Sequence, residues 1–157
     1  MKTKNIILIM LMSCFFSVGC EKNNDNEPKD NYPKEISFTE YSLVGTPCQW
    51  VNLNYDNSVI VISSNEELRN YIICTEGSYL EIDFSMWTLL VLNVVCCDAY
   101  SLIEKMLLQQ LSDNKYLLSI DVRPSITVTD TSVIISILTP KINNDSQIES
   151  DVKIIQN

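Results

Sequence analysis

Cysteines and carboxylates are the side chains of this sequence that could do chemistry, because it contains no histidine. Its 157 residues include six Cys, 20 Asp or Glu and 11 Lys or Arg. Without His, neither a Ser-His-Asp triad nor a zinc or haem site with imidazole ligands can form. A general base would have to be a carboxylate, Lys, Tyr or Cys. The net charge of 11 − 20 = −9 also argues against a nucleic-acid partner, which needs clustered Lys and Arg.

Residues 1–19 predict a signal peptide. Lys2 and Lys4 precede the segment 6–19, which carries no charge. An uncharged segment of this length suits a signal-peptide apolar region of about 7 to 15 residues and is short of the roughly 20 residues that span a membrane. The chain is therefore expected to be exported.

The leader ends in Ser17-Val18-Gly19-Cys20, and small residues before a Cys at this place resemble the lipobox of bacterial lipoproteins. The resemblance implies that Cys20 carries the lipid, becomes the mature N-terminus and anchors the chain in the cell envelope, with the outer membrane as the expected site. Ser17 stands where the usual pattern has an aliphatic residue, although looser patterns occur in Bacteroidetes lipoproteins. An ordinary secretory signal followed by a chance Cys is the alternative.

Residues 20–35 are expected to form the lipidated Cys and a flexible acidic tether. After Cys20, this stretch holds five acids, three Lys, four Asn and two Pro, with Tyr32 as its one apolar side chain. Such a composition buries too little apolar area to offset the entropy of ordering. A single β-rich domain is expected over 36–157.

Cysteines of an exported chain usually pair, because the compartment is oxidising. One Cys lies in the predicted leader and another is the predicted lipid anchor. The four that remain can form two disulfides in three ways; they are Cys48, Cys74, Cys96 and Cys97. We predict the disulfide Cys48–Cys74, between the start of a strand and the end of a helix. Cys96 and Cys97 are expected to be two small side chains at a strand end, with a bridge to the other pair or a vicinal redox pair as alternatives. No metal site is predicted, because two Cys-x-x-Cys knuckles are missing.

Carboxylates offer a second kind of chemistry, that of a small hydrolase. Glu81 and Asp83 flank Ile82 in a predicted loop. Two carboxyl groups about 5 Å apart in a cleft could act on a glycosidic bond. Because the acids are dispersed along the chain, a solvated surface is the favoured interpretation, and no catalytic residue is predicted.

Aromatic side chains offer a third possibility, a face that binds sugar or peptide, since they join large area to a polar tip. Packing in the core is the simpler explanation for most of them. Tyr55 and Tyr79 lie in polar turns and are the best candidates for exposed binding residues. The set considered is Tyr41, Trp50, Tyr55, Tyr79, Trp87 and Tyr100.

These side chains must be positioned mostly by strands. Alternation or β-branched runs predict about seven strands, at 36–41, 59–62, 88–95, 115–123, 132–139 and 152–155, with a further short one at 48–53. A capping box of Ser64 and Glu67 predicts one helix over 65–73. Polar loops are expected at 54–58, 74–79 and 143–150. By composition alone, 102–111 suits a helix as well as a strand, and the turn residues 112–114 follow it.

The order of these segments resembles that of uncharacterised Bacteroidetes lipoproteins over roughly 38–155. It is more distantly similar to β-rich domains of the protease-complex-subunit type, in which an apolar strand leads to a hairpin and a Pro-Lys strand end. The motifs carrying the resemblance are Ser64-x-x-Glu67-Leu68, Ile82-Asp83-Phe84-Ser85 and Thr139-Pro140-Lys141. The resemblance implies a strand at 102–111 and brings no active site. Cys96-Cys97-Asp98 stands where a small or Gly-rich turn is expected.

The sequence therefore predicts an α+β domain, mostly antiparallel sheet with one short helix near 65–73. The expected function is that of a non-catalytic binding module without a cofactor, held at the membrane by its N-terminal lipid. Its ligand is an unknown protein or glycan. A carboxylate-dependent hydrolase and a Cys-based redox protein are the rival hypotheses.

Overall fold

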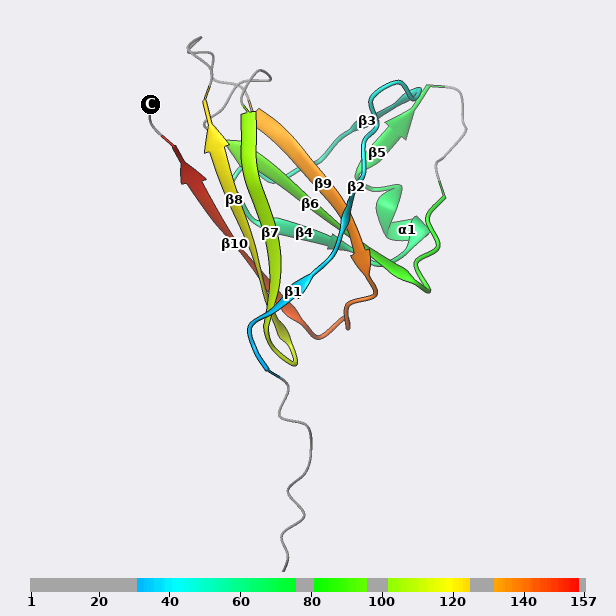
Figure 1. Ribbon diagram of the computed structural model, residues 1–157. Helices are drawn as coiled ribbons and strands as arrows, with labels where there is room; N and C mark the ends of the chain where they lie inside the picture. The colour runs from blue at the N-terminus through cyan, green and yellow to red at the C-terminus, as the bar shows by residue number, and fades with distance from the viewer. Residues whose placement is uncertain (1–30, 76–80, 96–101, 125–131, 156–157) are drawn as a thin grey trace, which may run out of the picture. The chain divides into compact units, whose positions relative to one another are not determined.

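The most apolar stretch of the chain after residue 19 forms strand β6 (Trp87–Val95), and the fold is built around it (Figure 1). The structure, a computed structural model, describes residues 31–75, 81–95, 102–124 and 132–155. Within these ranges there are ten strands and one helix. All of them belong to one unit that begins at Asn31.

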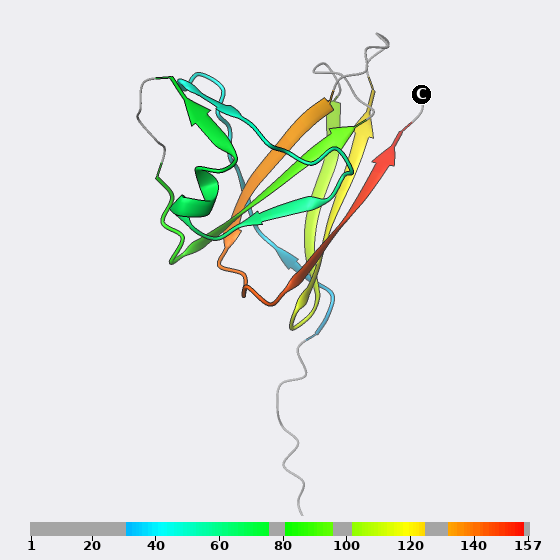
Figure 2. The same ribbon diagram turned by 180° about the vertical axis from the view of Figure 1, so that it is seen from behind.

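Two four-stranded sheets contain most of the strand residues that the structure describes. Sheet A has the order β1-β7-β8-β10, with bounds β1 (Lys34–Ile36), β7 (Leu102–Ser112), β8 (Lys115–Arg123) and β10 (Gln147–Ile154). Sheet B has the order β2-β9-β6-β4, with bounds β2 (Thr39–Glu40), β9 (Ser132–Pro140) and β4 (Val59–Ile62). Sheet C is a pair of short strands, β3 (Cys48–Trp50) and β5 (Ile72–Cys74), beside helix α1 (Asn65–Leu68). The views from front and back show sheets A and B as two layers, with sheet C and α1 to one side (Figures 1 and 2).

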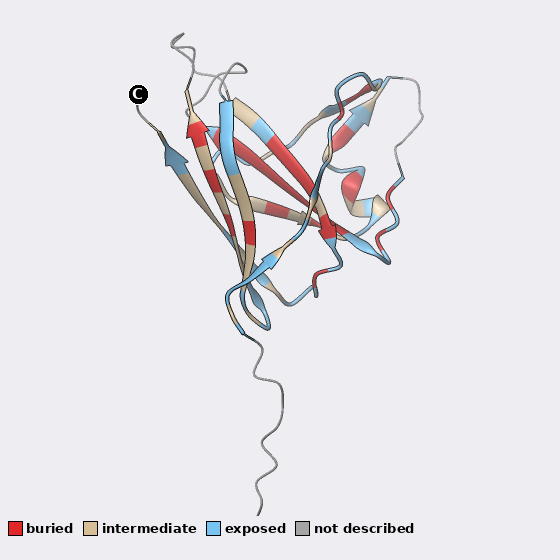
Figure 3. Ribbon diagram, in the orientation of Figure 1, coloured by how far each residue is buried: buried red, intermediate tan, exposed pale blue. Residues whose placement is uncertain are grey.

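Strand β6 is buried on both faces, which explains why its sequence does not alternate. Leu90, Leu92 and Val94 pack toward sheet A, in a cluster with the inward side chains of β7, β8 and β9. Leu89 and Val91 point the other way, into a second cluster with Ile62 of β4 and with residues of α1 and β5. Sheet B is therefore the middle layer, and Figure 3 shows the buried residues concentrated along it.

The expectation of mostly antiparallel sheet with one short helix is confirmed, but the α+β label fits loosely, because α1 has only four residues. The strand 102–111 is confirmed as β7, and Asp113 and Asn114 form the turn to β8. The structure has ten strands in its described residues, where about seven were expected. The first predicted strand is divided into β1 and β2, β5 was not expected, and 102–111 adds β7. Strand β10 pairs with β8 in parallel, while the other strand pairs are antiparallel.

The predicted helix is real but shorter than expected, since α1 ends at Leu68 and Ile72 already belongs to β5. The first half of its capping box is confirmed, because the Ser64 hydroxyl accepts the N–H of Glu67 at 3.1 Å. The Glu67 carboxylate also reaches back, but it accepts the N–H of Ser63 at 2.9 Å, one residue before the N-cap Ser64. The residues after Leu68 are drawn into pairing with β3, which removes them from the helix.

The last strand is longer than expected. Residues 143–150 were predicted to be a polar loop, but β10 begins at Gln147 and its first half pairs with β8. Gln147, Glu149 and Ser150 are polar because β10 is an edge strand, where polar and charged side chains are common. At the other end of the domain, β1 begins at Lys34, within the stretch assigned to the tether.

Candidate functional site

The N-terminal strand segment leaves sheet A and joins sheet B. Strand β1 pairs with β7 at residues 108–110, and β2 then pairs with β9 at residues 137–138. Ile36 and Phe38 pack against the core between the sheets as the chain crosses. The segment thus fills part of the gap between β7 and β9.

The opposite side of the two-sheet stack is held differently. There β10 approaches β4, and the Ser150 hydroxyl donates a hydrogen bond of 2.5 Å to the Asn57 carbonyl. The Asn57 side-chain oxygen in turn accepts the N–H of Val95 at 2.9 Å. Polar contacts thus join the sheets on that side.

The gap that the crossing segment does not fill is a groove of about 300 Å³. From sheet A it is lined by Ile103 and Met106, which lie on the face of β7 that packs inward. From sheet B it is lined by residues 134–136 of β9, and Trp50 of β3 and residues 40–44 complete its wall. Ile103 is 37% exposed and Ile134 is 41% exposed. The groove is therefore an apolar opening between two sheets; we call it the edge groove.

Two aromatic rings form one wall of the edge groove. Tyr41 and Trp50 meet edge to face, with ring centroids 6.1 Å apart. The Tyr41 hydroxyl oxygen is buried and lacks a hydrogen-bond partner among the described residues. Burial raises the pKa of Tyr41 above its ordinary value of 10.0, since the charged phenolate is disfavoured away from water. The site is thus apolar, with one unused polar atom in its wall.

The backbone of Tyr41 marks where strand pairing stops. The Tyr41 N–H donates to the Ser136 carbonyl at 2.8 Å, and the Ser136 hydroxyl donates to the Tyr41 carbonyl. After Tyr41 the chain turns away through Gly45, whose φ of 82° suits glycine. Beyond this point, residues 132–135 of β9 have no strand on their outer side within the described chain.

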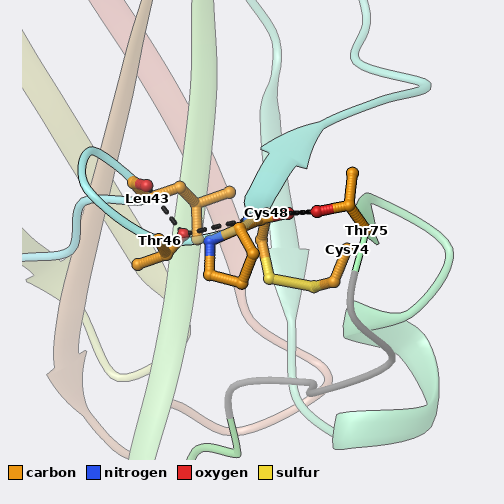
Figure 4. The surroundings of a disulfide bond; sticks show 6 residues. Leu43, Thr46, Cys48, Cys74 and Thr75 are labelled. Carbon is orange, nitrogen blue, oxygen red and sulfur yellow. Dashed lines mark hydrogen bonds between the residues drawn. A yellow bond between two sulfur atoms is a disulfide. The ribbon is translucent and has the colours of Figure 1, made fainter.

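The predicted disulfide between Cys48 and Cys74 is present (Figure 4). It joins β3 to β5 and thereby fixes the groove wall that Trp50 of β3 belongs to. The two cysteines lie opposite each other in the pairing of β3 with β5, two residues from the Trp50–Ile72 pair. Thr46 joins the same assembly: its hydroxyl donates to the Leu43 carbonyl at 2.7 Å and accepts the Cys48 N–H at 3.2 Å. Thr75 donates its N–H to the Pro47 carbonyl at 3.0 Å. The bridge therefore ties the loop after Tyr41 to β3 and β5.

Of the other aromatic candidates, the structure describes Tyr55 and Trp87, and neither lines this groove. Tyr55 is 76% exposed in the turn between β3 and β4, and it is absent from the groove lining. Trp87 lies at the first residue of β6, opposite Pro140. Tyr79 and Tyr100 lie outside the described residues, as do Cys20, Cys96 and Cys97.

The two carboxylates considered for hydrolysis are exposed, although the neighbouring Ile82 and Phe84 are buried in the core. The Asp83 carboxylate accepts the N–H of Ser85 at 3.0 Å and its hydroxyl at 2.5 Å. These hydrogen bonds lower the pKa of Asp83 below its ordinary value of 3.8, the bond from the hydroxyl having the larger effect. The Asp83 carbonyl also accepts the N–H groups of Met86 and Trp87. Asp83 thus shapes the turn that leads into β6, and Glu81 is exposed nearby.

Two other kinds of site are absent from the part of the chain that the structure describes. No cluster of three or more Cys, Asp or Glu side chains that could hold a metal ion occurs among them. Within the same ranges, no helix has the length and apolar character to cross a membrane.

Comparisons with known proteins add no relative: neither a protein-family model, nor a curated protein, nor a solved structure matches this chain.

Sequence reasoning found part of the edge groove and missed the rest. Tyr41 and Trp50 were in the aromatic set, although the exposed turn residues were preferred to them. Ile103, Met106 and Ile134 were missed, because each looks like an ordinary inward residue of a strand. Their exposure follows from where the crossing segment ends its pairing, and no local pattern encodes that point.

Proposed function

We propose that this chain is a lipid-anchored lipoprotein of the cell envelope, whose domain binds a partner in the edge groove without catalysis. Sequence supports the anchor: a charged start, an uncharged segment and small residues before Cys20. Two acyl chains give stable anchoring, whereas one chain is marginal. The single observation that carries the binding role is the edge groove itself, an apolar opening with the Tyr41–Trp50 pair in its wall.

The composition of the groove supports binding more than turnover. Its lining contains one carboxylate, Glu40, and two serines, Ser42 and Ser136. The Ser136 hydroxyl is already engaged with the Tyr41 carbonyl. Clefts that bind ligands are mostly apolar with a few polar groups, and this lining has that character.

One experiment with two arms tests the proposal. In the first arm, intact-mass analysis of the mature chain should show a start at Cys20 with a diacylglyceryl group and acyl chains, and Cys20→Ser should release the protein from the membrane fraction. An unmodified start at residue 20, or a retained leader, would contradict the anchor.

In the second arm, Trp50→Ala is compared with Trp87→Ala in capture of partners from envelope extract. Trp50 lies in the groove wall, while Trp87 is a partly exposed Trp of β6 outside the lining. A component that the wild type and Trp87→Ala retain should be lost with Trp50→Ala, provided that circular dichroism shows both variants folded. Equal capture by the two variants would contradict a binding role for the groove.

A further inference from the structure

The edge groove offers unpaired main chain as well as apolar side chains. Strand β1 covers only residues 108–110 of β7, so the described residues 102–107 have β8 on one side and no paired strand on the other. Residues 132–135 of β9 are likewise paired with β6 on one side and have no described strand paired on the other. Both free stretches adjoin the groove, to which they contribute Ile103, Met106, Ile134 and Ile135.

Ile134 presents its main chain to the open side of β9. Alternate residues of an antiparallel strand direct their N–H and C=O groups to opposite neighbours. The Ser136 carbonyl points outward, since it accepts the Tyr41 N–H. Two residues earlier, Ile134 therefore directs its N–H and C=O outward too, where no described strand pairs with it. These two groups can pair with a further strand.

We propose that the edge groove binds an extended peptide segment with basic flanks, which adds as a strand to the free edge of β9. This inference rests on the proposed binding role and names the class of partner. An added strand gains affinity from main-chain hydrogen bonds and specificity from alternate side chains placed in pockets. Here the alternate side chains enter between Ile103, Met106 and Ile135, and the flanks lie near the groove rim.

Charge decides between the candidate partners. The single ionisable carboxylate of the lining is Glu40, and no Lys or Arg lines the groove. The whole sequence carries a formal net charge of −9. A basic peptide is attracted to such a surface, whereas a second copy of the chain is repelled by it. A glycan would leave the free N–H and C=O of Ile134 without strand-like partners.

The test uses the full chain in non-ionic detergent and a fluorescein-labelled peptide, acetyl-KVTVTVK-amide, followed by fluorescence anisotropy. Two matched probes accompany it: EVTVTVE reverses the flanking charge, and KVTPTVK cannot pair as a strand, because Pro lacks the N–H. We expect a Kd of about 0.1 mM for KVTVTVK and at least about tenfold weaker binding of the other two. Binding of KVTVTVK should also weaken at high salt, which screens the charges.

Matched variants locate the site. Ile134→Pro removes the outward N–H and leaves the groups that Val133 and Ile135 direct to β6. Ile134→Lys is a second variant, which repels the basic probe; its control is Ile154→Lys on β10, because these two isoleucines are 41% and 43% exposed. Both Ile134 variants should weaken binding at least about tenfold, and Ile154→Lys should leave it unchanged within about twofold. In the wild type, the probe should protect the Ile134 amide from hydrogen exchange.

Several results would overturn the inference. These are no saturable binding of KVTVTVK up to about 5 mM, equal binding of KVTPTVK, or wild-type affinity in the Ile134 variants. Saturable binding of chitohexaose that Ile134→Lys abolishes would indicate a glycan site instead. A dimer in light scattering that Ile134→Lys dissociates would indicate a second copy. If KVTVTVK fails while Trp50→Ala still loses an envelope partner, the proposed function stands and the peptide inference falls.

Discussion

Tyr41 shows at the scale of one residue how the groove differs from ordinary core. Its ring packs on Trp50, yet its hydroxyl oxygen is buried without a partner among the described residues. A buried polar group without a hydrogen bond costs about 1 to 3 kcal/mol. Because Tyr41 lines the edge groove, we expect its hydroxyl to form a hydrogen bond with a bound ligand.

Tyr41→Phe should therefore raise the free energy of unfolding by about 1 kcal/mol at neutral pH. The difference in the free energy of unfolding between Tyr41→Phe and the wild type should increase above pH 10. The wild-type phenol ionises near pH 10.0 in the unfolded chain but at a higher pH in the folded one, so the folded state binds more protons there and loses stability as pH rises. Urea denaturation at several pH values measures both effects.

The control for this prediction is Tyr55→Phe, because Tyr55 is 76% exposed. It should change the free energy of unfolding by less than about 0.5 kcal/mol. A loss of stability in Tyr41→Phe at neutral pH would show that the hydroxyl has a partner in solution.

At the scale of elements, sheet C is held by one covalent bond, a few hydrogen bonds and the packing of Cys48 and Ile72 in the second hydrophobic cluster. Strands β3 and β5 have three residues each, too few to be stable as an isolated hairpin. The disulfide Cys48–Cys74 closes a loop between residues 26 apart in sequence. Because Trp50 lies two residues after Cys48, this bond also positions the wall of the edge groove.

Removing the bond with the double variant Cys48→Ser/Cys74→Ser should lower the free energy of unfolding by about 3 to 4 kcal/mol on the chain-entropy account. Urea denaturation measures the loss, and non-reducing peptide mapping of the wild type checks the bond directly. The variant should also bind the groove ligand less tightly, because β3 is less fixed. Free thiols at both positions in the wild type would contradict the prediction.

The elements also show what a sequence can and cannot predict here. The capping box placed the start of α1 correctly, because that signal lies within four residues. The end of α1 was misplaced, because Ile72 leaves the helix for a partner strand about twenty residues away in sequence. Strand β10 was recognised only in its second half, since the polar residues from Gln147 to Ser150 pair with β8 at a sheet edge without an apolar run. Pairing partners distant in sequence decided each of these boundaries.

At the scale of the whole domain, the same reason explains the candidate site. The aromatic residues were visible in the sequence, but the order of the strands in sheets A and B was not. The edge groove exists because β1 and β2 belong to different sheets and pair with β7 and β9 over short stretches. A binding site made by incomplete pairing has no motif of its own.

Strand β6 separates two hydrophobic clusters and contributes side chains to both. Neither cluster can lose its order without exposing one face of that strand, so the domain should melt cooperatively, as one two-state transition. Scanning calorimetry should show a single endotherm whose van't Hoff and calorimetric enthalpies agree, and two resolved endotherms would contradict this. A substitution that destabilises the packing around α1 should therefore lower the melting temperature of the whole domain, sheet A included.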